Sequence, residues 1–425
     1  MKKITTIVST ALVGVTMYAD TMEASNEYQV SIPSVREITQ TIGQPEEKSV
    51  SKADGLEQMF TKGKASGQLK SIYAGYDFAP SDTTDTYATA VGGQLKYELA
   101  ELNGFNAAAA FYTSHDVDAL TGDGSKQNNE LSSSQGSYTQ LAEAYINYKY
   151  NGLNLRAGRQ VIDTPLSDSD DIRMIPNTFE AYIASYELED LTFMAGLLKN
   201  WQGFDADLDG GWQETGENGT YLASLSYETQ PFAASAWYYD ITKSLKAYYA
   251  DGTYNYEISE NYAFHVSAQV LLEREVDNSG YEADIYGASA EFEAYGAGFN
   301  IAYNKAVVPE GKQSFSGFGG GALFTSMDMM ILDNIAADRD VDALVGGVSY
   351  RIYDFNIMYA YGDYSGGRDS LGQKAHVVEQ NLVFEYNISD DLLFSAIYVK
   401  EDDKENKNDA QTNWDRYHMM ITYNF

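Results

Sequence analysis

From Ser66 to Phe425 the sequence alternates apolar and polar residues with a period of two. This period is typical of β-strands, whose successive side chains point to opposite faces of a sheet. The alternation divides into about eighteen segments, each near the roughly 9–11 residues that a tilted strand needs to cross a membrane. The predicted strands are 66–78, 87–99, 104–113, 138–150, 153–161, 177–189, 191–201, 219–228, 231–240, 244–258, 262–273, 282–293, 296–305, 342–351, 354–362, 377–388, 391–400 and 414–425.

The connections between these segments alternate in length. Tight turns are predicted at Asn151-Gly152, Glu189-Asp190, Gln230-Pro231, Tyr295-Gly296, Tyr353-Asp354 and Ser389-Asp390. Long polar stretches lie between them, around 79–86, 114–137, 162–176, 202–218, 274–281, 306–341, 363–376 and 401–413. Transmembrane barrels have short turns on the periplasmic side and long loops outside, whereas a soluble β-sandwich has no reason for this asymmetry. We therefore predict an all-β fold, an antiparallel transmembrane β-barrel of about eighteen strands.

The last strand shows which side chains face which solvent. Its apolar face consists of Tyr417, Met419, Ile421, Tyr423 and Phe425, and its polar face of Arg416, His418, Met420, Thr422 and Asn424. In a membrane the first set faces lipid and the second faces water. A barrel of this size leaves a water-filled lumen.

Composition supports a barrel and excludes several other classes. The chain has 35 Tyr, 18 Phe and 36 Gly but only 7 Pro, as many short strands and turns require. The mean hydropathy is -0.38 and no run approaches the roughly 18 apolar residues of a membrane-spanning helix. A net charge of -34 argues against binding nucleic acid, and the absence of Cys excludes disulfides and thiolate metal sites.

The N-terminal region differs from the rest. Residues 1–19 combine Lys2 and Lys3 with an apolar core and a small residue at Ala19, which predicts a secretory signal peptide. Residues 20–65 have no sustained periodicity and are expected to be a partly disordered periplasmic segment. Within 53–64 the helical spacing of Leu56, Met59 and Phe60 predicts a short helix, and the barrel is expected over 66–425.

The stretch 162–176 stands out among the loops because it is rich in Asp, Ser and Pro and carries one Arg. If it folds inward it narrows the pore, and its charges lie where solutes pass. An exposed acidic hairpin loop is the alternative. The candidate constriction residues are Asp163, Asp168, Asp170, Asp171 and Arg173.

The same region resembles a known family. The residues Gly158-Arg159-Gln160, Thr164-Pro165, Asp170-Asp171, Arg173, Pro176-Asn177 and Phe179-Glu180 are similar to the third-loop region of the OprD-like outer-membrane porins. The resemblance implies an eighteen-stranded monomeric or loosely trimeric channel, with an eyelet made by 162–176 and part of 306–341. It also implies a ladder of wall bases, and here the residues on predicted lumen faces are Lys149, Arg156, Arg416 and His418.

Tyr423 and Phe425 resemble the terminal aromatic signal that the barrel-assembly machinery reads. The leading hypothesis is therefore a porin of the bacterial outer membrane that lets small hydrophilic solutes or ions diffuse passively, surrounded by lipid and lipopolysaccharide. It uses no catalytic residue, cofactor or metal, since only 4 His are present and no Gly-x-Ser-x-Gly elbow accompanies them. The alternatives are an outer-membrane lipid hydrolase or a closed structural barrel, and bilayer conductance separates them.

Overall fold

The protein is described by a computed structural model, which covers residues 51–79, 82–133, 136–259, 261–407 and 409–425. The signal peptide expected at 1–19 and the part of the N-terminal segment at 20–50 lie outside the described residues. Within the described ranges, the helices are too short or too polar to span a membrane.

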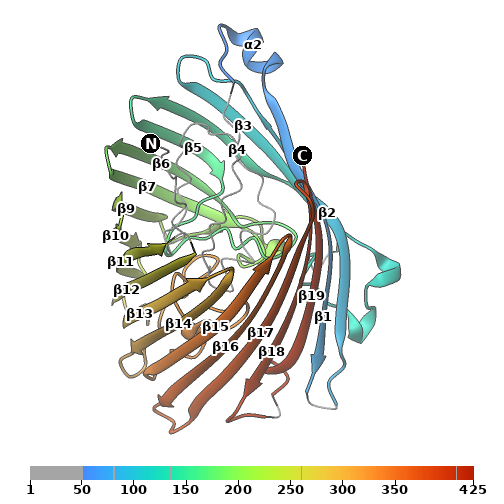
Figure 1. Ribbon diagram of the computed structural model, residues 1–425, viewed down its shortest axis with the longest axis vertical. Coiled ribbons are helices and arrows are strands. Elements are labelled where there is room, and N and C mark those ends of the chain that lie inside the picture. Colours follow the sequence, from blue (N-terminus) through green and yellow to red (C-terminus); the bar gives the residue numbers. More distant parts are fainter. Residues whose placement is uncertain (1–50, 80–81, 134–135, 260, 408) are drawn as a thin grey trace.

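The strands form one antiparallel sheet in which each long strand pairs with the next along the chain (Figure 1). β1 also pairs with β19, so the sheet closes into a barrel of eighteen long strands. This confirms the predicted fold. The strands are β1 (Lys64–Phe78), β2 (Thr86–Glu98), β3 (Phe105–Asp116), β4 (Tyr138–Tyr150), β5 (Leu153–Gln160), β6 (Thr178–Leu188), β7 (Leu191–Gln202), β8 (Gln213–Glu214), β9 (Thr220–Thr229), β10 (Phe232–Ile241), β11 (Leu245–Ser259), β12 (Tyr262–Glu275), β13 (Ala283–Ala294), β14 (Ala297–Val307), β15 (Val341–Ile352), β16 (Phe355–Arg368), β17 (Lys374–Ser389), β18 (Leu392–Asp403) and β19 (Asn413–Asn424).

The largest differences from the sequence prediction are the end of β16 and the presence of the short strand β8. β16 was predicted to end at 362 but continues to Arg368, because the Gly- and Ser-containing end still pairs with β15 and β17. β8 has two residues, which pair with the end of β7 inside the long connection between β7 and β9, so it is an addition to the rim and not a further wall strand.

The connections have the predicted asymmetry. At the turn between β4 and β5, Asn151 and Gly152 both have positive φ, 46° and 81°. Two-residue hairpins need this backbone because it matches the twist of the strands, and Asn-Gly adopts it at little steric cost. The long connections leave the opposite end of the barrel.

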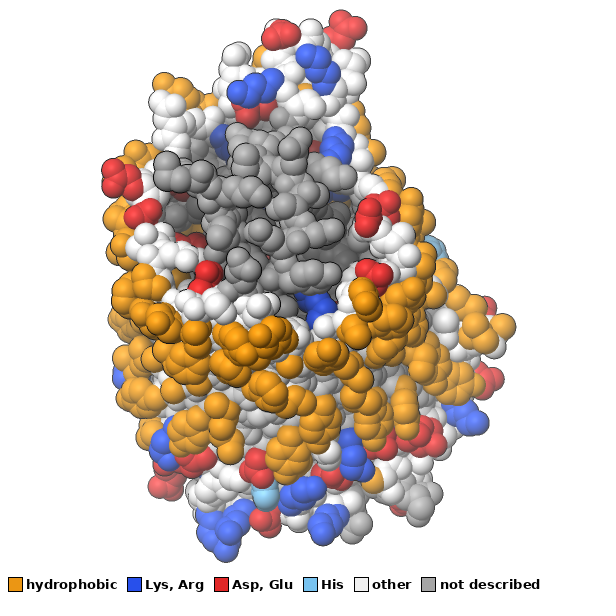
Figure 2. All heavy atoms as spheres, in the orientation of Figure 1, with side chains coloured by type: hydrophobic (Ala, Val, Ile, Leu, Met, Phe, Trp, Pro, Cys, Tyr) orange, Lys and Arg blue, Asp and Glu red, His pale blue; other side chains and the backbone are white. Residues whose placement is uncertain are grey.

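Burial alternates along the wall as the sequence predicted. In β19, Arg416, His418 and Thr422 are buried inside the barrel, whereas Met419 and Ile421 remain 47% and 46% exposed. Figure 2 shows such hydrophobic side chains as a band across the visible face of the outer wall, with charged residues above and below it. This is the surface that a lipid bilayer covers in a transmembrane barrel.

The predicted short helix is present as α2 (Leu56–Thr61). It lies at the rim rather than across the barrel mouth (Figure 1). Met59 packs with Ala53 and Ala100, and the amide of Ala100 donates a hydrogen bond of 2.9 Å to the carbonyl of Met59. The helix is therefore a lead-in that is fixed to the connection between β2 and β3.

We expect deletion of Phe425 to block assembly while leaving secretion intact. Phe425 and Gly67 exchange two backbone hydrogen bonds of 3.1 Å, which complete the end of the β1–β19 seam. Each backbone group left unpaired in lipid costs several kcal/mol. The folded fraction can be measured by heat-modifiable gel mobility of outer-membrane extracts. Phe425→Tyr keeps both hydrogen bonds and serves as the control, and normal folded levels of the truncated protein would contradict the expectation.

Candidate functional site

The connection between β5 and β6 folds into the barrel (Figure 1). Most of its side chains are buried, including Leu166, Met174 and Ile175, which belong to the apolar core of the lumen. An outward acidic hairpin would expose these residues, so the structure favours the inward alternative of the sequence analysis. This connection, residues 161–177, is called the first lumen loop below.

The aspartates of the first lumen loop shape its backbone. Asp163 accepts a hydrogen bond of 2.9 Å from the amide of Ser169, and Asp168 accepts one of 2.8 Å from the amide of Asp170. Asp170 itself has a φ of 44°, a conformation that Asp tolerates better than most residues. The Asp side chains therefore stabilise the tight fold of the loop backbone as well as giving the loop its negative charge.

A second lumen loop, residues 308–340 between β14 and β15, is anchored to the wall by side chains of the strands. Glu273 accepts a hydrogen bond of 3.0 Å from the amide of Phe315, and Gln269 accepts one of 3.0 Å from the amide of Phe324. Asn304 accepts one of 3.1 Å from the amide of Thr325. These wall residues satisfy backbone groups that would otherwise be buried without partners.

The two lumen loops contact each other directly. The amide of Asp168 donates a hydrogen bond of 2.8 Å to the carbonyl of Phe318, whose own amide donates one of 2.9 Å to the carbonyl of Leu166. The ring of Phe318 also packs edge-on against Trp201, with ring centroids 5.4 Å apart. The loops therefore form one unit across the lumen.

Buried ion pairs connect this unit to the barrel wall. Lys70 of β1 contacts Asp171 at 2.7 Å, and both side chains are at most 2% exposed. Arg173 contacts Asp170 at 3.1 Å and lies within 3.7 Å of Asp205, which comes from the connection between β7 and β9. Four of these five residues are on loops, and Lys70 is the fixed wall position.

Arg416 of β19 forms the second wall anchor. Its guanidinium is fully buried and contacts Asp328 of the second lumen loop at 2.8 Å. It also donates hydrogen bonds to Glu130, from the connection between β3 and β4. Glu130 in turn lies 3.9 Å from Arg173. Three loops thus meet on bases of β1 and β19, the two strands that close the barrel.

The electrostatic environment of the loop carboxylates follows from this network. Burial alone would raise the pKa of Glu130, but the charges of Arg416 and Arg173 lower it to about 2. Burial raises the pKa of Asp171, and Lys70 offsets only part of that rise. Enclosure in the barrel and the charge of Asp170 raise the pKa of Asp205 to about 6, although 28% of its side chain stays exposed.

The structure places the sequence-predicted wall residues at different heights. Arg416 and His418 lie beside the lumen loops, and Nε2 of His418 has no hydrogen-bond partner in the described part of the chain. Arg156 lies nearer the short-turn end, where its guanidinium covers the ring of Tyr145 at 4.4 Å. Lys149 is at the end of β4 and exposed. Of the three bases predicted on the lumen wall, Lys149, Arg156 and Arg416, only Arg416 lies beside the lumen loops. The base that pairs with Asp171 is Lys70, which was not predicted.

Sequence reasoning missed Lys70, Glu130, Asp205 and Asp328. Lys70 carried a usable signal, because it alternates with Leu69 and Ser71 in β1 and shares the inward face with Gln68 and Ile72. Glu130, Asp205 and Asp328 had no such signal in the sequence, because each is one of many acids in long loops.

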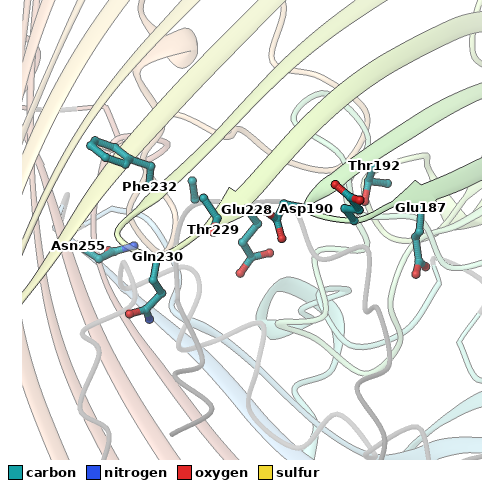
Figure 3. A pocket seen from close by; sticks show the side chains of 10 residues that line it. Glu187, Asp190, Thr192, Glu228, Thr229, Gln230, Phe232 and Asn255 are labelled. Carbon is teal, nitrogen blue, oxygen red and sulfur yellow. The ribbon is translucent and has the colours of Figure 1, made fainter. Parts of the chain in front are cut away.

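A separate cavity of about 330 Å³ lies at the short-turn end of the barrel. Figure 3 shows carboxylates of Glu187, Asp190 and Glu228 on its rim. They come from the ends of β6 and β9 and the turn between β6 and β7, so this cavity is distinct from the lumen-loop unit and adds negative charge at the other mouth.

A comparison with protein families matches residues 104–425 to the family described as outer membrane porin, OprD family. The chain belongs to the OprD family of outer membrane porins. It is therefore an outer-membrane channel for small solutes, as the sequence predicted.

Solved structures of this fold are similar over nearly their whole length. Acinetobacter baumannii OccAB2 has a TM-score of 0.74 at 13% identity, covering 87% of this chain and 99% of that chain. Pseudomonas aeruginosa OpdK, solved with vanillate, has a TM-score of 0.73 at 15% identity, covering 85% and 98%. Pseudomonas aeruginosa OccK9 has a TM-score of 0.74 at 12% identity, covering 86% and 99%. Among curated proteins no sequence matched significantly.

We expect Lys70→Met to destabilise the OprD-family barrel because it leaves Asp171 buried without its partner. Removing one member of a buried ion pair costs about 3–5 kcal/mol, whereas replacing both with apolar residues is close to neutral. Lys70→Met combined with Asp171→Leu should therefore recover most of the lost stability. Urea unfolding in detergent measures the free energy of unfolding of the single and the double variant. A double variant as unstable as the single one would show that the pair does not hold the loop.

Proposed function

We propose that the lumen-loop unit is the constriction of this porin and that it prefers cations. The observation that carries the proposal is the charge of the first lumen loop together with the ion-pair network around it, where acids outnumber bases by seven to three. The acids are Glu130, Asp163, Asp168, Asp170, Asp171, Asp205 and Asp328, and the bases are Lys70, Arg173 and Arg416. In a narrow pore, fixed charges within the roughly 8 Å Debye length of physiological salt act on passing ions.

The charges of the constriction are not equivalent. Asp170 and Asp171 are paired to Arg173 and Lys70 and are at most 6% exposed. Asp205 lies 3.7 Å from Arg173, and 28% of its side chain is exposed. The carboxylate of Asp205 therefore reaches lumen water, whereas Asp170 and Asp171 chiefly hold the loop in place.

We further propose that solutes cross by passive diffusion, with no covalent step. Membership of a porin family supports this over the lipid hydrolase and the closed structural barrel. Discrete conductance steps in planar bilayers, without hydrolysis of the bilayer lipid, are the expected result. Silence in the bilayer together with lipid hydrolysis would favour the enzyme.

For the partners we propose that the barrel-assembly machinery reads Tyr423 and Phe425, and that the outer loops contact lipopolysaccharide. The two aromatic side chains remain 43% and 48% exposed on the outer face of the last strand, where another protein can reach them. The assembly state that we propose is a monomer or a loose trimer.

Asp168→Asn, Asp170→Asn and Asp171→Asn together should shift ion selectivity away from cations. The triple variant removes three negative charges from the constriction, while Arg173→Ala removes a positive one and should shift selectivity the opposite way. The measurement is the reversal potential of single barrels in a salt gradient.

A matched control removes three exposed acids from connections outside the two lumen loops, Asp118→Asn, Asp123→Asn and Glu405→Gln. Bulk salt screens those positions, so their reversal potential should stay near that of the wild type. If the lumen triple variant also keeps the wild-type reversal potential and conductance, the first lumen loop is not the selectivity element.

Cation preference should fall when the pH is lowered from about 7.5 to about 5. Asp205 has a pKa of about 6, so it is charged above that pH and neutral below it, and acidification removes one negative charge from the constriction. Asp205→Asn should show a lower preference at the higher pH and a weaker pH dependence. Asp209→Asn, which changes an exposed acid of the same connection, is the control, and equal pH dependence in both variants would contradict the assignment.

A further inference from the structure

The short helix α2 presents a second apolar side, besides the one that packs on the connection between β2 and β3. Leu56 and Phe60 are four residues apart, so they share one side of the helix. Their side chains remain 71% and 60% exposed, whereas Met59 is buried against Ala53 and Ala100. The packed side fixes the helix to the barrel, and the exposed apolar side indicates a second contact.

This apolar side is continuous with the lipid-facing wall of the barrel. The hydroxyl of Tyr97, on the outward face of β2, donates a hydrogen bond to the carbonyl of Phe60. Leu102, which packs beside Met59, exchanges two backbone hydrogen bonds of 2.8 and 3.0 Å with Phe105. Tyr97 and Phe105 are 41% and 51% exposed on the surface that lipid covers. The helix is therefore held at the edge of the apolar band.

Aromatic side chains mark the membrane boundary at this end of the barrel. The ring of Phe105 packs against the ring of Tyr148, with centroids 4.4 Å apart, and Tyr150 at the end of β4 is 62% exposed. Aromatic residues form such girdles where the lipid meets water. A helix tied to this girdle lies at the level where amphipathic helices bury an apolar side below the headgroups.

The charge of the segment suits this position. Residues 51–64 contain three Lys against one Asp and one Glu, so their net charge is +1, whereas the whole chain carries -34. Two of the bases lie side by side, since the ammonium group of Lys62 donates a hydrogen bond of 3.2 Å to the carbonyl of Lys52. Both side chains are exposed. Anionic phospholipids attract bases near the membrane surface, and they repel the acid-rich segments that dominate this chain.

A protein partner fits the exposed side of α2 less well. Stable protein interfaces bury roughly 1,200–2,000 Å² of surface, and two side chains on a six-residue helix supply a small part of that area. A lipid surface needs no matching shape, because it takes up any apolar side chain that reaches it.

We propose that α2 is a membrane-surface anchor that inserts Leu56 and Phe60 among the phospholipids of the periplasmic leaflet. Lys52 and Lys62 contact the headgroup phosphates beside it. The anchor holds the start of β1 against the membrane, and so steadies the strand that closes the barrel with β19. This role goes beyond the channel function, because it does not depend on which solute passes.

The test places a spin label on the helix of the full-length protein. The chain contains no Cys, so Leu56→Cys gives a single labelling site. One barrel is placed in each nanodisc of phosphatidylethanolamine and phosphatidylglycerol. Electron paramagnetic resonance then measures collisions of the label with oxygen, which concentrates in lipid, and with a nickel chelate, which stays in water. We expect oxygen collisions to exceed chelate collisions at position 56.

Thr61→Cys is the matched control, because Thr61 is exposed on the other side of α2 and should collide more often with the chelate. Equal chelate access at positions 56 and 61 would overturn the anchor, since both sides of the helix would then face water. Rare collisions with both reagents at position 56 would overturn it in favour of a contact with protein.

A second measurement needs no label. Leu56→Ser combined with Phe60→Ser removes the apolar side of α2 but keeps Met59 and the backbone carbonyl that Tyr97 contacts. Trypsin cleavage after Lys62 in the nanodiscs should become about tenfold faster or more, because inserting each large apolar side chain contributes more than this factor. Unchanged cleavage would overturn the anchor.

Glu57→Ser combined with Thr61→Ala changes the polar side of α2 and should keep the wild-type cleavage rate. Cleavage accelerated equally in this control would overturn the anchor, because the effect would then not depend on the apolar side. Conductance steps in potassium chloride report the channel separately. Their absence from the wild-type barrel would overturn the channel function and leave the anchor intact.

Discussion

Backbone hydrogen bonding in lipid is the constraint on which the rest of this structure depends. The hydrocarbon core offers no partner for N–H and C=O groups, so a sheet can cross it only when every edge is paired. Here the pairing of β1 with β19 removes the last two edges. Closure then fixes which side chains face inward, because a shift of one residue in any strand would exchange its lipid and lumen faces.

The inward face creates a second constraint, since charges in the lumen are far from bulk water. Lys70 and Arg416 are almost fully enclosed, and each is paired with carboxylates from inward loops. Such pairs add little net stability over apolar packing, but an incomplete pair is strongly unfavourable. They therefore specify one position for each loop, which is what a pore with a defined narrow point requires.

The strands of the barrel wall could be predicted from the sequence, but only part of the interior could. The period of two and the lengths of the connections were sufficient to predict all eighteen long strands. The alternation around Met419 and Ile421 correctly predicted which side chains face lipid and which face the lumen. Strand β16 was predicted six residues too short, because polar Asp363 on the outer face and apolar Tyr364 on the inner face reverse the alternation after Gly362. The partners of Arg416, namely Glu130 and Asp328, lie 286 and 88 residues away in sequence, and only the closed wall brings them together. The inward course of the first lumen loop followed from its resemblance to an eyelet, whereas its pairing with Lys70 depends on strand register.

The position of the two wall anchors sets an order in time. Glu130 and Asp328 find their common base on β19, which is synthesised last, and Asp171 finds its base on β1, which pairs with β19 at closure. Arg416 can pair with these two acids only when β19 is in place, so the ion pairs of Glu130 and Asp328 are completed together with the wall. The second lumen loop is thus secured by the same strand that removes the last open edge of the sheet.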